Sequence, residues 1–70
     1  MIKITEFISD SGNKFFWQEE IKTMYFLTEY DSIERMPPDT TILSLSSHVP
    51  IATMEDIEVD SIDDLIEGNK

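Results

Sequence analysis

The block of apolar side chains at residues 15–27 most constrains how this chain can fold. Eight of its thirteen residues are large and apolar, and it holds five of the seven aromatic side chains. Residues 22–29 are rich in β-branched and aromatic types, so we predict a strand there. Residues 14–20 fit either the return strand of a hairpin or a helix, because Trp17 and Ile21 also fall at helical spacing. We expect the core to be built on this block.

The length of the chain and its lack of cysteine restrict how it can be stabilised. The chain has 70 residues and no cysteine. A domain of this size buries only about 60% of the surface that its unfolded chain exposes. Neither a disulfide nor a thiolate metal site can add to the stability that this burial provides. No apolar run is long enough for a signal peptide or a membrane span. We predict one small domain over residues 1–70 in a cytoplasmic protein.

The N-terminal half carries two further signals. Residues 2–9 alternate as a strand does, with the isoleucines and Glu6 on one face and Phe7 on the other. Residues 10–13 are turn formers, after which residues 14–20 could return as the second strand of a hairpin. Residues 31–36 predict a short helical turn, which the two prolines after it would end.

The C-terminal half predicts one strand and one helix. Residues 40–46 alternate between apolar and polar types, which indicates a strand. Residues 51–59 fit either a helix start or an edge strand. Ser61 and Asp64 form a capping-box pattern ahead of an apolar stripe, so we predict a short helix over residues 61–67.

Together these elements predict an α+β fold. The sheet is small and antiparallel, with three or four strands, and it packs against the short C-terminal helix. The predicted core consists of Phe7, Trp17, Ile21, Met24, Phe26, Ile42, Leu43, Leu45, Ile62 and Leu65.

The charge of the chain restricts its partners. Fifteen acidic residues stand against five basic ones, which gives a formal net charge of −10. Such a surface repels phosphate backbones and anionic lipids, so we expect neither direct nucleic-acid binding nor membrane binding. A protein with a basic surface is the expected partner, because opposite charges speed encounter. The chain is also compatible with a homodimer.

The acids are densest in the C-terminal segment 55–67, which has seven acidic residues and no basic one. Such a run is often only a solvated face that raises solubility. As a recognition surface, its spaced carboxylates would imitate the phosphates of a nucleic acid. The candidate partner-binding residues are Asp56, Glu58, Asp60, Asp63, Asp64 and Glu67.

Signals for catalysis or for a bound metal are missing from the sequence. The acids from Asp56 onward match several ligand positions of an EF-hand loop, but Ser61 stands where that loop needs glycine and Asp63 where it needs an apolar residue. His48 is the single histidine, and no base or nucleophile pattern surrounds it. We therefore predict no catalytic residue, no metal site and no cofactor.

The sequence favours a non-enzymatic, acidic protein-interaction module. One concrete form is an inhibitor or nucleic-acid mimic of the kind that phages and mobile elements encode. The first alternative is a structural or accessory subunit that docks through the aromatic block 15–30. The second is a calcium-binding module.

Overall fold

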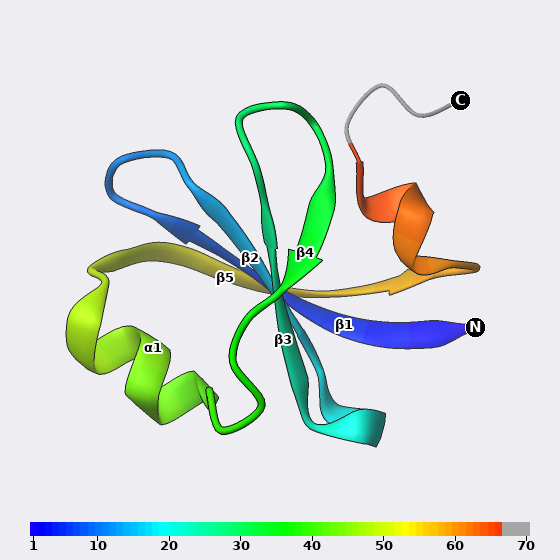
Figure 1. The fold of residues 1–70 in the computed structure, drawn as a ribbon, viewed down its shortest axis with the longest axis horizontal. Coiled ribbons are helices and arrows are strands. Elements are labelled where there is room, and N and C mark those ends of the chain that lie inside the picture. Colours follow the sequence, from blue (N-terminus) through cyan, green and yellow to red (C-terminus); the bar gives the residue numbers. More distant parts are fainter. Residues whose placement is uncertain (67–70) are drawn as a thin grey trace.

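Within residues 1–66, the part of the chain that the computed structural model describes, the fold is a five-stranded antiparallel sheet with one α-helix and two 3-10 helices (Figure 1). The strand order is β4-β3-β2-β1-β5, so the first four strands form a meander and the last one returns to pair with the first. The elements are β1 (Ile2–Ser9), β2 (Lys14–Gln18), η1 (Glu19–Ile21), β3 (Thr23–Leu27), β4 (Ile33–Arg35), α1 (Ile42–His48), β5 (Ile51–Val59) and η2 (Ile62–Leu65).

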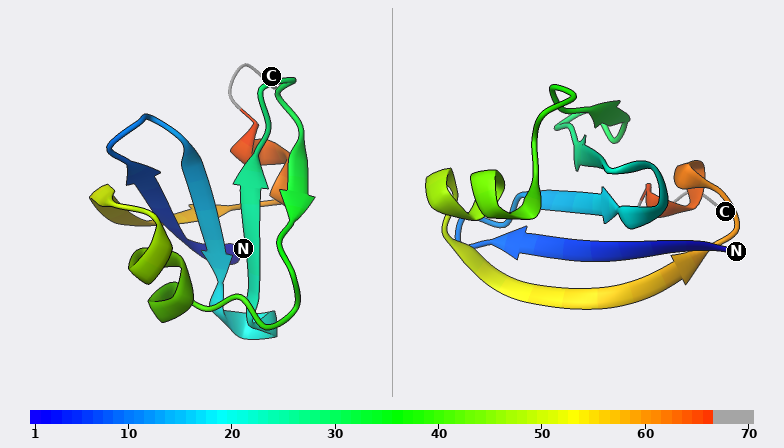
Figure 2. Two further views of the ribbon diagram at one scale, coloured as in Figure 1. Left: turned by 60° about the vertical axis from the view of Figure 1, so that its left-hand side comes forward. Right: turned by 90° about the horizontal axis from the view of Figure 1, so that it is seen from below.

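Each face of the sheet carries its own cluster of buried side chains, because successive residues of a strand point to opposite faces. The cluster on the η2 face consists of Ile4, Phe16, Tyr25 and Leu65. The cluster on the α1 face consists of Phe7, Trp17, Met24 and Leu45. The two covering elements, α1 and η2, lie at opposite ends of the curved sheet (Figure 2). The aromatic block therefore supplies both clusters.

The predicted fold class is wrong. Strands make up 45% of the structure and helical residues 21%, so the fold is mostly β rather than α+β. The largest error concerns residues 40–46, which were expected to form a strand and instead lie mostly in α1. Thr41 and Ser44 form a capping box, in which each side chain accepts a hydrogen bond from the other's backbone N–H, at 3.1 and 2.8 Å. The helix then buries Leu45 against the sheet.

Two further predicted elements are also wrong. Residues 33–35 form the short strand β4 and not part of a helical turn, because the chain reverses after β3 and pairs again with it. That reversal contains Asp31 in the left-handed region, at φ 58°. The C-terminal helix over residues 61–67 is instead the four-residue 3-10 helix η2, although the capping box of Ser61 and Asp64 is present. Residue 67 lies outside the described residues.

The strands predicted in the first half are confirmed. Residues 2–9 form β1, and of the two alternatives left open for residues 14–20 the returning strand is found, as β2 at residues 14–18. The strand predicted at 22–29 is β3. Of the two alternatives for residues 51–59, the edge strand is confirmed, because β5 lies at one edge of the sheet beside β1.

The predicted core is confirmed in part. Five of its members are buried: Phe7, Trp17, Met24, Leu45 and Leu65. Two members are wrong, since Ile21 and Leu43 are 49% and 79% exposed. The prediction missed Ile4, Phe16 and Tyr25, which form the cluster on the η2 face together with Leu65.

Among residues 1–66, no helix has the length and apolar character needed to cross a membrane.

Candidate functional site

Two of the predicted binding residues, Asp56 and Glu58, lie side by side on the same face of β5. They are two residues apart on an extended strand, so both side chains lie on the α1 face. Thr5 of β1 lies opposite Asp56, and its hydroxyl donates a hydrogen bond to Asp56 Oδ1 at 3.0 Å. Lys3 lies opposite Glu58. Both carboxyl groups are exposed.

The other predicted residues occupy different places. Asp60 follows β5, and Asp63 and Asp64 lie on η2, which packs on the opposite face of the sheet through Leu65. The Asp64 carboxylate accepts a hydrogen bond from the Ser61 backbone N–H at 3.2 Å, so it caps η2. Glu67 is outside the described residues. The described members of the predicted set are therefore divided between two faces and do not form one continuous row.

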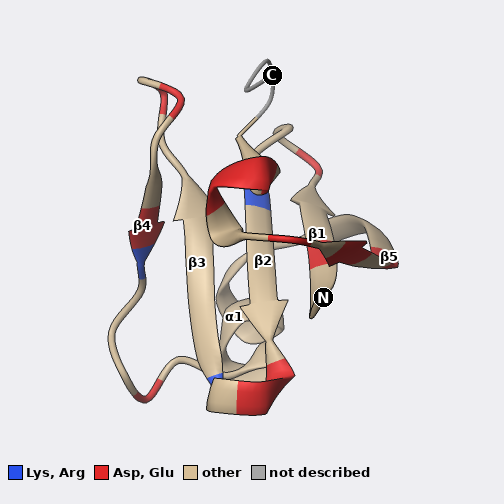
Figure 3. Cartoon of the chain, turned by 90° about the vertical axis from the view of Figure 1, so that its right-hand side faces the viewer, with Lys and Arg blue, Asp and Glu red and all other residues tan. Residues whose placement is uncertain are grey.

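A hollow of about 530 Å³ lies beside Asp56 and Glu58 on the α1 face. Its charged lining residues are Glu19, Asp56, Glu58 and Lys3. Its remaining lining residues are Ile4, Thr5, Trp17, Ile42 and Ile57. We call this feature the acidic hollow. Figure 3 shows acidic residues in red on β5 and on η1 after β2, the two elements that supply the three carboxylates.

Trp17 gives the acidic hollow a fixed apolar wall. It is only 6% exposed and packs in the cluster with Phe7, Met24 and Leu45. Its indole Nε1–H donates a weak hydrogen bond of 3.4 Å to Glu19 Oε1. The burial of Trp17 in this cluster sets the position of the wall.

The position of Glu19 is set by the tight connection between β2 and β3. The 3-10 helix η1 spans Glu19–Ile21 and is followed by Lys22, which is in the left-handed region with φ 51°. The Lys22 ammonium forms an ion pair with the Glu19 carboxylate. Both side chains are largely exposed, so this pair contributes little to stability but restricts where the carboxylate can lie.

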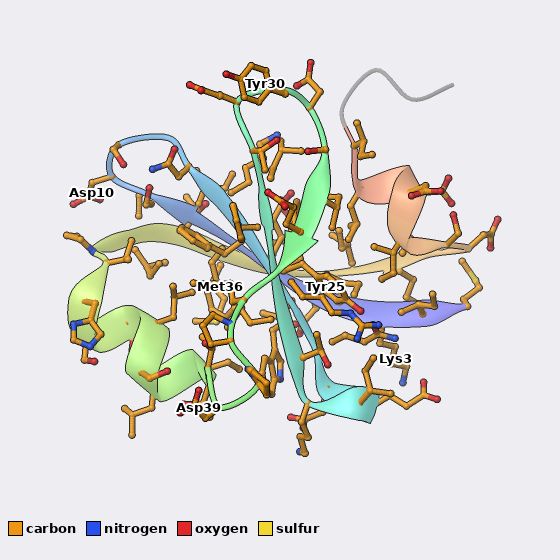
Figure 4. All side chains as sticks on the ribbon, in the orientation of Figure 1. Lys3, Asp10, Tyr25, Tyr30, Met36 and Asp39 are labelled. Carbon is orange, nitrogen blue, oxygen red and sulfur yellow. The ribbon has the colours of Figure 1, made fainter. Side chains whose placement is uncertain are left out.

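The charges of the acidic hollow favour a cationic ligand. Among residues 1–66, three carboxylates line it, and Lys3, on β1 near η1, is its single basic residue (Figure 4). An arginine or lysine side chain has an aliphatic stem and a charged end, which suit an apolar wall and an acidic rim respectively. Phosphate groups would be repelled by the same carboxylates.

The aromatic block offers less exposed apolar surface than the sequence suggested. Phe16, Trp17 and Tyr25 are buried, and Phe15 is half-buried. Tyr30 is 83% exposed at the tip of the β3–β4 turn (Figure 4). It lines a second hollow, of about 490 Å³, together with Phe15, Glu29 and others. We call this second feature the Tyr30 hollow.

No group of three or more histidine, aspartate or glutamate side chains within residues 1–66 is arranged to hold a metal ion. The segment that resembled an EF-hand loop begins as strand, since residues 56–59 belong to β5 and pair with β1. His48 is exposed at the end of α1 and lines a smaller hollow with Asp39 and Val49.

The sequence-based prediction included Asp56 and Glu58, which line the acidic hollow, but not Glu19 or Trp17, which line it with them. No local pattern connects residues 17–19 with residues 56–58. They come together because β1 pairs with β2 on one side and with β5 on the other.

Comparison with models of known protein families, with curated proteins and with solved structures gave no match to this chain. Its function is therefore inferred from the geometry alone.

Proposed function

We propose that this chain is a non-enzymatic, cytoplasmic interaction module that binds a basic surface of another protein through the acidic hollow and β5. The observation that carries the proposal is the acidic hollow itself. Carboxylates from η1 and β5 surround a wall of Trp17 and Ile42, and Lys3 is the single basic residue that the described part of the chain adds to the lining. The site therefore offers a lysine or arginine side chain both charge and apolar contact.

The charge of the whole chain supports the same proposal. A net charge of −10 attracts a basic partner over distances of about a Debye length, near 10 Å at moderate salt. A partner that normally grips phosphates with arginine and lysine would find the carboxylates of Asp56 and Glu58 already held on a strand. Inhibition of such a protein by mimicry of nucleic acid is the concrete form that we favour.

Docking through the aromatic block has less support. Most of that block is turned into the two clusters, and Tyr30 is its one strongly exposed aromatic side chain. The calcium alternative has the least support, because the segment begins as a paired strand rather than as a ligand-binding loop.

The proposal is tested with a flexible peptide of alternating lysine and glycine, titrated calorimetrically into the protein at low salt. The test variant combines Asp56→Asn with Glu58→Gln. The control combines Asp10→Asn with Glu29→Gln, which makes the same change in net charge with two exposed acids elsewhere. Because Glu29 lines the Tyr30 hollow, the control also reports binding there.

We expect the test variant to weaken binding about fivefold to thirtyfold, since two exposed charge pairs contribute roughly 1–2 kcal/mol together. The control should weaken binding less than about threefold. Equal losses in both variants would mean that the peptide senses only net charge, and the proposal would be wrong. A larger loss of binding in the control variant would indicate that the peptide binds at the Tyr30 hollow instead.

A further inference from the structure

The edge strand β5 is long for a strand that has one unpaired side. It spans nine residues and pairs only with β1 among the described residues, whereas β4 at the other edge spans three residues. An unpaired edge presents backbone N–H and C=O groups that can pair with another strand. Proline is absent from residues 51–59, so no residue of β5 lacks a backbone donor.

The side chains of β5 decide which strand could pair with it. Residues 52–56 and Glu58 are exposed. Glu55 lies on the η2 face, while Asp56 and Glu58 lie on the α1 face, so both faces of the edge are acidic. Like charges that lie directly opposite each other across a strand pair are destabilising, and opposite charges are stabilising.

A second copy of this chain is therefore a poor occupant of the edge. Antiparallel pairing of two β5 strands about Glu55 would place that residue against its own copy. It would also place the two Asp56 side chains diagonally across the strand pair from each other. An extended segment rich in lysine or arginine would instead meet opposite charge on both faces.

We propose that β5 recruits an extended basic segment of the partner as an additional strand at this edge. The inference rests on the proposed function and names the form in which the basic surface is bound. Main-chain hydrogen bonds would supply affinity, and alternate side chains would supply specificity. Basic residues two positions apart would lie beside Asp56 and Glu58, and an apolar residue would lie beside Met54, which is 64% exposed on the same face.

The test compares two peptides of identical sequence and charge, each with alternating lysine and threonine. One has an ordinary backbone, and the other carries N-methyl groups along both edges, which remove the donors that strand pairing requires. Binding is measured by calorimetry, and amide hydrogen exchange is followed at residues 51–59 of the protein. The comparison of the two peptides uses the unmutated protein, so loss of folding cannot imitate loss of binding in that comparison.

We expect methylation to weaken binding about tenfold or more, because several main-chain hydrogen bonds are lost. Amide exchange in β5 should slow only with the unmethylated peptide, and exchange in β3 should not change. Equal binding of both peptides, each sensitive to Asp56→Asn with Glu58→Gln, would overturn strand addition and leave the proposed function standing. If neither these peptides nor the flexible peptide bind, both proposals are wrong. A dimer at low salt that pairs through β5 would also overturn the inference.

Discussion

Replacing Trp17 with alanine is the strongest test of a core that lies on both faces of the sheet. Trp17 is 6% exposed and contacts Phe7, Met24 and Leu45 in the cluster on the α1 face. Removing a buried aromatic side chain of this kind costs about 3–5 kcal/mol, because apolar burial is lost and a cavity remains. A domain of 70 residues has a total stability of about 4–10 kcal/mol. The substitution should therefore remove between about a third and all of the free energy of unfolding.

The assay is urea unfolding followed by far-ultraviolet circular dichroism, since the variant has no tryptophan to report by fluorescence. Tyr30→Ala is the matched aromatic control, because Tyr30 is 83% exposed, and it should change the free energy of unfolding by less than about 0.5 kcal/mol. If Trp17→Ala were as stable as Tyr30→Ala, Trp17 would not be a core residue. The packing described for the α1 face would then be wrong.

Four further substitutions probe the helix α1 and the pairing of β1 with β5, each measured by the same unfolding assay. Thr41→Ala should cost about 0.5–2 kcal/mol by removing the cap of α1, whereas no loss would mean that residues 42–48 are not a capped helix. Leu45→Ala should lower the free energy of unfolding by about 2–5 kcal/mol. Leu43→Ala, at a site that is 79% exposed, should lower it by less than about 0.5 kcal/mol. Equal losses in the two variants would indicate that residues 40–46 form a strand, with both leucines on one face. Glu55→Lys should raise the free energy of unfolding by about 0.2–1 kcal/mol, because Glu55 of β5 lies opposite Glu6 of β1. A loss of stability would contradict that register.

The elements that the sequence predicted correctly are those with strong local signals. Alternation in residues 2–9 predicted β1, and strand-forming residues at 22–29 predicted β3. The turn formers at 10–13 made β2 one of the two alternatives for residues 14–20. These strands are joined by short connections, so local pattern and tertiary pairing agree.

The incorrect elements are those in which two patterns compete within the same residues. Residues 40–46 alternate as a strand, yet Ile42, Leu45 and Val49 also fall on one side of a helix, and the cap at Thr41 favours that alternative. Residues 31–36 contain helix-capping types, but Ile33 packs on the η2 face as part of β4. In both segments tertiary packing determines the secondary structure, and local propensity is not sufficient to predict it.

The candidate site also combines residues with a local sequence signal and residues without one. The density of acids in residues 55–67 pointed to Asp56 and Glu58, and the alternation of that segment gave their common face. The association of Glu19 and Trp17 with them depends on pairing between residues far apart in the sequence. A single sequence contains no signal for that pairing.

The most direct test of the central claim is a two-dimensional NMR titration with the unmethylated lysine–threonine peptide. The chain has one tryptophan, so the indole N–H of Trp17 gives a single resolved signal inside the acidic hollow. We predict saturable shifts of that signal and of the backbone amides of residues 52–58, which weaken as salt is added. Shifts confined to residues 28–32, around Tyr30, with no change at Trp17 or β5, would contradict the proposed site.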